Sequence, residues 1–309
     1  MDPSFHEIRG QYTTRPKERA SRSSRKEPEL DLSRNIYARA LATPPRACAT
    51  TRTVLPNFFL VKFKTVKDPE QDKNWFVPTE VSLTSDGLRV QEEMPGPGSL
   101  ALCRQELFRE FSVAGSKYHG ADKTFGKLRQ TRRQATGGKN PLWREDMDSY
   151  ILTLLRGHIT QCLVRFAGMF ETAGRKYISK SDSWEDIKQR TSIGCVLYLG
   201  PKLDQAEQDI HESASRPLPP PPGRLSIMDL KDDKMETKVP IHDLQVLLGQ
   251  ENVARLRDRK ALFRDGAIFV LAGKRTEDLQ MQLWRLQGYM ATQELDNPKK
   301  PEAAQQALP

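Results

Sequence analysis

The sequence predicts an α/β fold: a mixed sheet with flanking helices, a disordered basic N-terminal tail and a polar C-terminal tail. Residues 193–199 and 267–272 are apolar at nearly every position, as expected of strands buried on both faces. Apolar residues recur at three- and four-residue spacing through 147–169, which indicates a long helix. Strands and helices alternate along the chain, and this order favours one layered α/β domain.

The 309 residues divide into four segments. Residues 1–34 are polar and rich in Arg and Ser, so we expect a disordered basic or targeting segment, although its acids are unusual for a transit peptide. Residues 35–56 are expected to dock on the domain as an extended segment. Residues 57–291 form the predicted domain, with a basic loop at 118–140 and a proline-rich insertion at 203–223. Residues 292–309 are expected to be a disordered tail.

Three strands are expected in the first part of the domain. The first covers 58–66, with Lys62 and Lys64 on the side away from the apolar residues. The second covers 75–79, where Pro78 indicates an edge strand or a strand end. The third, at 100–103, leads into a helical turn.

The long helix is expected to begin at Asn140 and Pro141, with the asparagine as cap, and to end near Gly174. His158 lies on its apolar face, where a hydrogen-bonded core or interface histidine is expected. The other members of that face are Met147, Tyr150, Ile151, Leu154, Leu155, Cys162, Phe166 and Met169.

The last part of the domain is expected to contain a strand end at 238–242, then two short helices separated near Gly249. Thr276 is expected to cap the final helix. The buried stripe predicted for that helix consists of Leu279, Leu283, Leu286 and Tyr289.

The net charge of +9 is unevenly distributed. Residues 1–55 hold eleven Lys and Arg against six Asp and Glu, and residues 118–140 hold six against one. The rest of the chain is close to neutral. Segments with such an excess of cations attract polyanions, including RNA and DNA. Solubility and targeting explain the same charges, and the sequence leaves both interpretations open.

Cysteine spacing and hydropathy restrict the class of protein. Cys48, Cys103, Cys162 and Cys195 form no CxxC pair, so reduced thiols in an intracellular compartment are expected. No stretch approaches the roughly 18 consecutive apolar residues of a transmembrane helix, so no transmembrane insertion is expected.

No motif indicates catalysis, a cofactor or a metal. The five histidines lie on separate segments, without zinc spacing. Residues 271–276 join a strand to a helix but lack the glycine and hydroxyl positions of a phosphate loop. Glu145, Asp146 and Asp148 cluster near the start of the long helix. Acids there complement the helix dipole, although a nuclease would also need such acids around a metal.

The basic loop holds the candidate nucleic-acid contacts, since Phe125 and Trp143 stand among or beside its cations. Cations with nearby aromatic rings suit single-stranded RNA. A solvated loop fits the same residues. The candidate contacts are Lys123, Lys127, Arg129, Arg132, Arg133 and Lys139.

Residues 35–46 resemble a motif of the fungal mitochondrial family "required for respiratory growth protein 8". The pattern is N-x-Y-x-R-x-L-A-x-P-x-R, formed here by Asn35, Tyr37, Arg39, Leu41, Ala42, Pro44 and Arg46. The resemblance continues more faintly to about residue 290, and the basic loop and the proline-rich insertion are departures from it. It implies a mitochondrial location and a role in maintaining and expressing the mitochondrial genome, and it transfers no catalytic residue. From the residues themselves, Tyr37 and Leu41 are expected to dock, with Arg39 and Arg46 exposed.

The function expected is therefore that of a non-catalytic mitochondrial factor, located in the matrix. Its expected partners are mitochondrial RNA, the nucleoid or the mitoribosome. Two alternatives remain at this point: an RNA- or DNA-processing enzyme that uses Glu145, Asp146 and Asp148, and a structural subunit of the mitoribosome.

Overall fold

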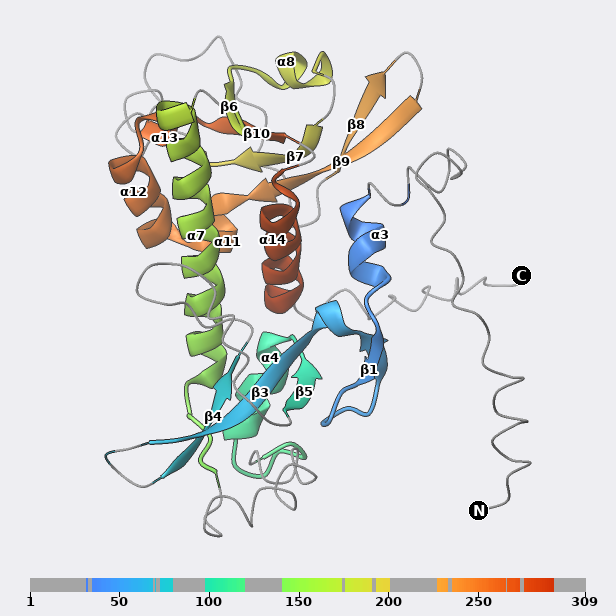
Figure 1. The fold of residues 1–309 in the computed structure, drawn as a ribbon, viewed down its shortest axis with the longest axis vertical. Coiled ribbons are helices and arrows are strands. Elements are labelled where there is room, and N and C mark those ends of the chain that lie inside the picture. Colours follow the sequence, from blue (N-terminus) through green and yellow to red (C-terminus); the bar gives the residue numbers. More distant parts are fainter. Residues whose placement is uncertain are drawn as a thin grey trace, which may run out of the picture.

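Two sheets of more than two strands, with the long helix α7 (Met147–Ala173) running between them, organise the described residues (Figure 1). The computed structural model describes residues 32, 35–68, 70, 73–79, 98–119, 141–173, 176–190, 193–200, 227–232, 235–264, 266–272 and 275–291. The predictions for the two tails, for residues 120–140 of the basic loop and for the proline-rich insertion lie outside these residues.

The larger sheet has five strands in the order β6-β10-β7-β9-β8. Strands β7 and β9 are parallel, and the other neighbours are antiparallel, which confirms the predicted mixed sheet. The strands are β6 (Ile178–Ser181), β7 (Ile193–Tyr198), β8 (Ile227–Asp232), β9 (Met235–Asp243) and β10 (Ile268–Ala272).

Strand β7 is buried on both faces, as its apolar run predicts. Cys195 and Leu197 point into the larger core, whereas Val196 and Tyr198 belong to a second cluster on the opposite face. Helix α8 (Trp184–Lys188) contributes Ile187 to that second cluster. Strands β6 and β8 and helix α8 were not predicted, because each is short and carries several polar residues.

The smaller sheet has three antiparallel strands in the order β4-β3-β5. They are β3 (Leu60–Lys67), β4 (Asn74–Pro78) and β5 (Ser99–Leu102), followed by helix α4 (Gln105–Ser112). Pro78 ends an edge strand, as predicted. Lys64 alternates with Phe63 and Thr65 on the strand, so it lies on the predicted side, yet it is only 4 % exposed, and both faces of the central strand β3 are covered along this stretch.

Helix α7 (Met147–Ala173) begins six residues after Pro141, so the predicted start is wrong. Leu142 instead extends the small sheet: its N–H donates to the Asn74 carbonyl at 2.7 Å, and its carbonyl accepts from the Phe76 N–H at 3.1 Å. These hydrogen bonds satisfy backbone N–H and carbonyl groups on the open edge of β4, and they keep Leu142 extended, so the helix begins later. The predicted apolar face is largely correct, and it also includes Ile159, Leu163 and Ala167.

The last described part of the chain contains four helices: α11 (Leu244–Leu248), α12 (Gln250–Arg259), α13 (Ala261–Arg264) and α14 (Glu277–Met290). Gly249 ends α11 at a φ of 78°, which favours glycine. The four stripe residues predicted for α14 are all buried. Thr276 occupies the N-cap position of α14, as predicted, but its hydroxyl accepts from the Gln280 side chain at 2.8 Å and makes no cap hydrogen bond.

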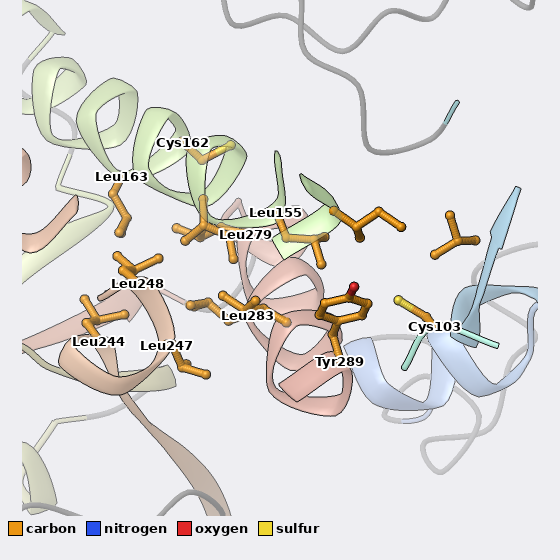
Figure 2. Close-up of a cluster of buried hydrophobic side chains, with 14 of the residues drawn as sticks. Cys103, Leu155, Cys162, Leu163, Leu244, Leu247, Leu248, Leu279, Leu283 and Tyr289 are labelled. Atoms are coloured by element: carbon orange, nitrogen blue, oxygen red, sulfur yellow. The ribbon is translucent and has the colours of Figure 1, made fainter. Parts of the chain in front are cut away.

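Helices α7, α11 and α14 pack together on one face of the larger sheet, and their leucines interdigitate (Figure 2). One continuous core runs from Cys48 to Tyr289 and includes residues of both sheets. All four cysteines are buried free thiols, as expected from their spacing. Among the described residues, no helix combines the length and apolarity that crossing a membrane requires.

Candidate functional site

The family motif begins with a short helix, α3 (Ile36–Leu41), so the prediction of an extended segment is wrong for these residues. Asn35 starts the helix: its side-chain oxygen accepts from the N–H groups of Tyr37 at 2.9 Å and Ala38 at 3.2 Å. The helix stops before Pro44, since a residue that precedes proline disfavours helical backbone. Strands β1 (Pro45–Ala47) and β2 (Val54–Pro56) then form an extended hairpin.

An aromatic cluster attaches the motif to helix α14. We define the aromatic cluster as Tyr37, Phe58, Phe59 and Trp284. The Tyr37 and Trp284 ring centroids are 4.9 Å apart and nearly perpendicular. Phe58 stacks on Trp284 with centroids 5.4 Å apart, and Phe59 meets the same indole edge-on at 5.4 Å. Rings in these geometries stabilise the contact beyond simple burial.

An ion pair lies beside the aromatic cluster. The Arg39 guanidinium pairs with the Glu277 carboxylate, in the first turn of α14, with side chains 51 % and 27 % exposed. The motif residue Arg46 is exposed, as predicted. Tyr37 docks as predicted, and burial raises the pKa of its hydroxyl.

Leu41 does not dock and is 56 % exposed, which corrects the prediction. The helix instead turns Ile36 and Ala40, one turn apart, into the core. Ala42 closes the helix by donating its N–H to the Ala38 carbonyl at 2.9 Å, and the Pro44 carbonyl accepts from the Asn57 N–H at 3.1 Å. Ala42 and Pro44 therefore contribute backbone hydrogen bonds that hold the motif in its conformation.

The six cations predicted to contact nucleic acid lie outside the described residues, but both flanks of their segment are described. Tyr118, on one flank, packs against the core. Trp143, on the other, lies 5.0 Å from Phe111 and 5.3 Å from Phe63, centroid to centroid. The Ser112 hydroxyl also donates to the Glu145 carbonyl at 2.7 Å. The two flanks are thus fixed beside α4 and the smaller sheet.

The acids proposed for the enzyme alternative have separate partners. Asp146 accepts from the Arg144 Nη2 at 2.9 Å, and this hydrogen bond holds the pKa of Asp146 below its usual value. Asp148 instead lies 3.6 Å from the Arg109 Nε. Glu145 is exposed. Within the part of the chain that the structure describes, no three His, Cys, Asp or Glu side chains gather as metal ligands would.

Sequence reasoning missed the residues that receive the motif, Trp284 and Glu277. The available signal was Trp284 itself, a large aromatic residue next to the buried position Leu283 on the final helix. Thr43 was also missed. Its hydroxyl accepts from the Phe58 N–H at 3.1 Å and donates to the Ala40 carbonyl at 2.7 Å, which links α3 to the aromatic cluster.

Comparison with known proteins gives one match. The family model described as "Required for respiratory growth protein 8 mitochondrial" matches residues 5–85, a range that contains the motif, the β1–β2 hairpin, β3 and β4. No curated protein and no solved structure matches the chain. The match confirms, over residues 5–85, the resemblance of this chain to a mitochondrial family required for respiratory growth.

Proposed function

We propose that the chain acts in the mitochondrial matrix as a non-catalytic factor that supports respiratory growth through maintenance and expression of the mitochondrial genome. Its partner in this proposal is mitochondrial RNA, the nucleoid or the mitoribosome, and basic segments of the chain bind it. The family match supports the mitochondrial role in respiratory growth. The arrangement of charge supports the choice of partner.

The observation that carries the proposal is the anchoring of the basic segment. Six Lys and Arg stand against one Asp in residues 118–140, whereas the chain outside this segment and the N-terminal 55 residues is close to neutral. Tyr118 and Trp143 fix both flanks on the folded core. Because both flanks are fixed on the core, a polyanion that meets one cation of this segment gains from meeting several of them together.

The non-catalytic part of the proposal rests on the acids of α7. Asp146 and Asp148 point to different arginines, and each arginine belongs to the protein itself. Catalysis by paired carboxylates requires that both face a common metal or substrate. The observed ion pairs favour a structural role for these acids.

A salt titration tests the proposal. The protein binds a fluorescent single-stranded mitochondrial transcript, and the affinity is followed as salt rises. Six phosphate contacts give a log–log slope near −4, from about −0.7 per contact. Replacing four cations of the loop by Gln should flatten the slope by about 3 units and weaken all sequences alike. The replacements are Lys127→Gln, Arg129→Gln, Arg132→Gln and Arg133→Gln.

The matched control removes four exposed lysines elsewhere: Lys73→Gln, Lys180→Gln, Lys188→Gln and Lys238→Gln. It should bind almost as the wild type does. If the loop variant and the wild type give the same slope, the loop is a solvated surface and the proposed contact is wrong. Crosslinking in purified mitochondria, followed by sequencing of the bound nucleic acid, identifies the natural partner.

A further inference from the structure

A second basic surface lies where helix α7 ends, far from the basic loop. In Figure 1 the end of α7, helix α13 and strands β6 and β10 come together at the top of the molecule, whereas the small sheet that anchors the loop lies at the bottom. Three exposed arginines come from different elements of this end: Arg165 from α7, Arg264 from α13, and Arg275 just after β10.

A chain of contacts through a pair of aromatic rings connects two of these arginines. The Arg165 guanidinium lies 5.3 Å from the Phe166 ring centroid. Phe166 meets the half-buried Tyr177 ring edge-on, with centroids 5.6 Å apart. The Tyr177 hydroxyl in turn accepts from the Arg275 Nη1 at 3.1 Å. One tyrosine therefore lies between two exposed arginines.

Lys260, which precedes the third arginine in the sequence, lies on the other side of α7. A Cβ added to Gly168 would lie 3.2 Å from the Lys260 Nζ, so the end of this lysine side chain lies against α7 at Gly168. In an α-helix, position 165 lies about 100° from position 166 and about 60° from position 168, on opposite sides. Arg165 thus stands between Tyr177 and Lys260. Arg264 comes four residues after Lys260 in the sequence, at the end of α13.

We propose that this basic surface, defined as Arg165, Lys176, Tyr177, Lys260, Arg264 and Arg275, binds single-stranded nucleic acid. The inference deepens the proposed function and rests on it, because it adds a second contact for the same class of partner. Phosphate groups pair with the arginines, and a base stacks on Tyr177. Aromatic rings among cations suit single strands, because every base has a face that can stack.

The balance of charge fits a polyanion. From Gln250 to Arg264 the chain carries five Lys and Arg against Glu251 and Asp258. Glu251 pairs with Arg255, one turn away on α12, so that carboxylate is already engaged. Arginine is suited to phosphate because its planar guanidinium offers two parallel donors.

The test uses the full chain and two labelled 20-nucleotide probes, oligo(U) and oligo(dT), at several salt concentrations. The triple variant Arg165→Gln, Arg264→Gln and Arg275→Gln removes three phosphate contacts. Its slope should be flatter than that of the wild type by about 2 units, from about 0.7 per contact. The control variant Lys73→Gln, Lys188→Gln and Lys238→Gln has the same net charge and should keep the wild-type slope.

Tyr177 gives an independent readout. Tyr177→Leu should weaken binding by about fivefold or more, since it removes a stacking face, whereas Tyr177→Phe keeps that face and should bind nearly as the wild type does. Thermal unfolding shows whether each variant folds. If Tyr177→Leu fails to fold, the triple arginine variant and Tyr177→Phe decide the question.

The possible outcomes distinguish failure of this second surface from failure of the proposed function. A wild-type slope in the triple variant, together with a flattened slope in the loop variant, overturns this surface and leaves the proposed function standing. No binding of either probe by the wild type overturns both. Binding to anionic lipid vesicles without binding to either probe also overturns this surface as a nucleic-acid contact. Oligo(U) and oligo(dT) together show whether the surface distinguishes RNA from DNA.

Discussion

The Tyr37 ring meets the Trp284 ring edge-on at 4.9 Å, so the start of the family motif is held by the last helix of the fold. Among the described residues, the Tyr37 hydroxyl has no hydrogen-bond partner although it is buried. The contact therefore depends on the rings. The neighbouring ion pair of Arg39 with Glu277 is partly exposed, and such pairs contribute little.

A double-mutant cycle on Tyr37 and Trp284 should give a coupling free energy of about 0.5–1.5 kcal/mol. Urea unfolding of the wild type, Tyr37→Leu, Trp284→Leu and the double variant measures it. Tyr37→Phe should keep or raise stability, because it removes a buried hydroxyl without a partner. A coupling near zero, or a marked loss in Tyr37→Phe, would show that the rings do not carry the contact.

Arg156 should stabilise the fold by closing the C-terminal end of α11. Its Nε donates to the Leu247 carbonyl at 2.8 Å, and its Nη2 lies 3.4 Å from the Val246 carbonyl. Arg156→Met keeps the apolar stem and removes these donors, so we expect a loss of about 1–2 kcal/mol in the free energy of unfolding. The matched variant Arg255→Met breaks only an exposed pair with Glu251 and should cost about 0.5 kcal/mol or less. Equal losses in the two variants would contradict the capping role.

The parts of the fold that the sequence predicts are those with a strong local pattern. Strands β7 and β10 are apolar throughout, and α7 repeats its apolar face over 27 residues. Strand β6 and helix α8 have only four and five residues, too few to establish a period. Pro141 is a good first helical residue, yet Leu142 pairs with the edge of β4, and that long-range pairing determines where the helix starts.

In the candidate site, too, contacts between residues far apart in the sequence could not be predicted from local patterns. The sequence predicts that Tyr37 docks on the domain, but it does not predict the residue on which Tyr37 docks. Its partner Trp284 stands almost at the other end of the chain, and no local pattern links two residues so far apart. The N-caps of α3 and α11, in contrast, depend only on nearby residues. The Asn35 and Asp243 side chains each accept from backbone N–H groups within three residues, so local sequence is enough to explain these two helix starts.

Removing the acids at the start of α7 should leave respiratory growth intact if the protein is non-catalytic. Glu145→Gln and Asp146→Asn are exposed changes and should each cost about 1 kcal/mol or less. Asp148→Asn should cost more than either, because Asp148 is nearly buried and lies beside Arg109. Growth on a respiratory carbon source and urea unfolding measure the two effects. Loss of growth in a normally folded variant would instead favour the enzyme alternative.

His242 should make stability depend on pH. It lies on β9 beside Leu197 of β7 and is 1 % exposed. Burial lowers the pKa of His242 to about 4, because the charged ring loses its hydration, and the Gln287 side chain opposes the shift in part. In the unfolded chain the pKa is about 6.5.

Between about pH 6.5 and pH 4 the unfolded chain therefore binds more protons at this histidine than the folded protein does. Stability rises with pH in that window and is lost as the pH falls through it. The difference in pKa corresponds to about 3 kcal/mol. His242→Leu removes the titrating group, whereas the carboxylates are common to both proteins and cancel in the difference. Urea unfolding from pH 7.5 to pH 4 should show the wild type losing about 2–3 kcal/mol more than the variant. Parallel stability curves would mean that His242 is protonated in the folded protein, with its charge accommodated inside the core.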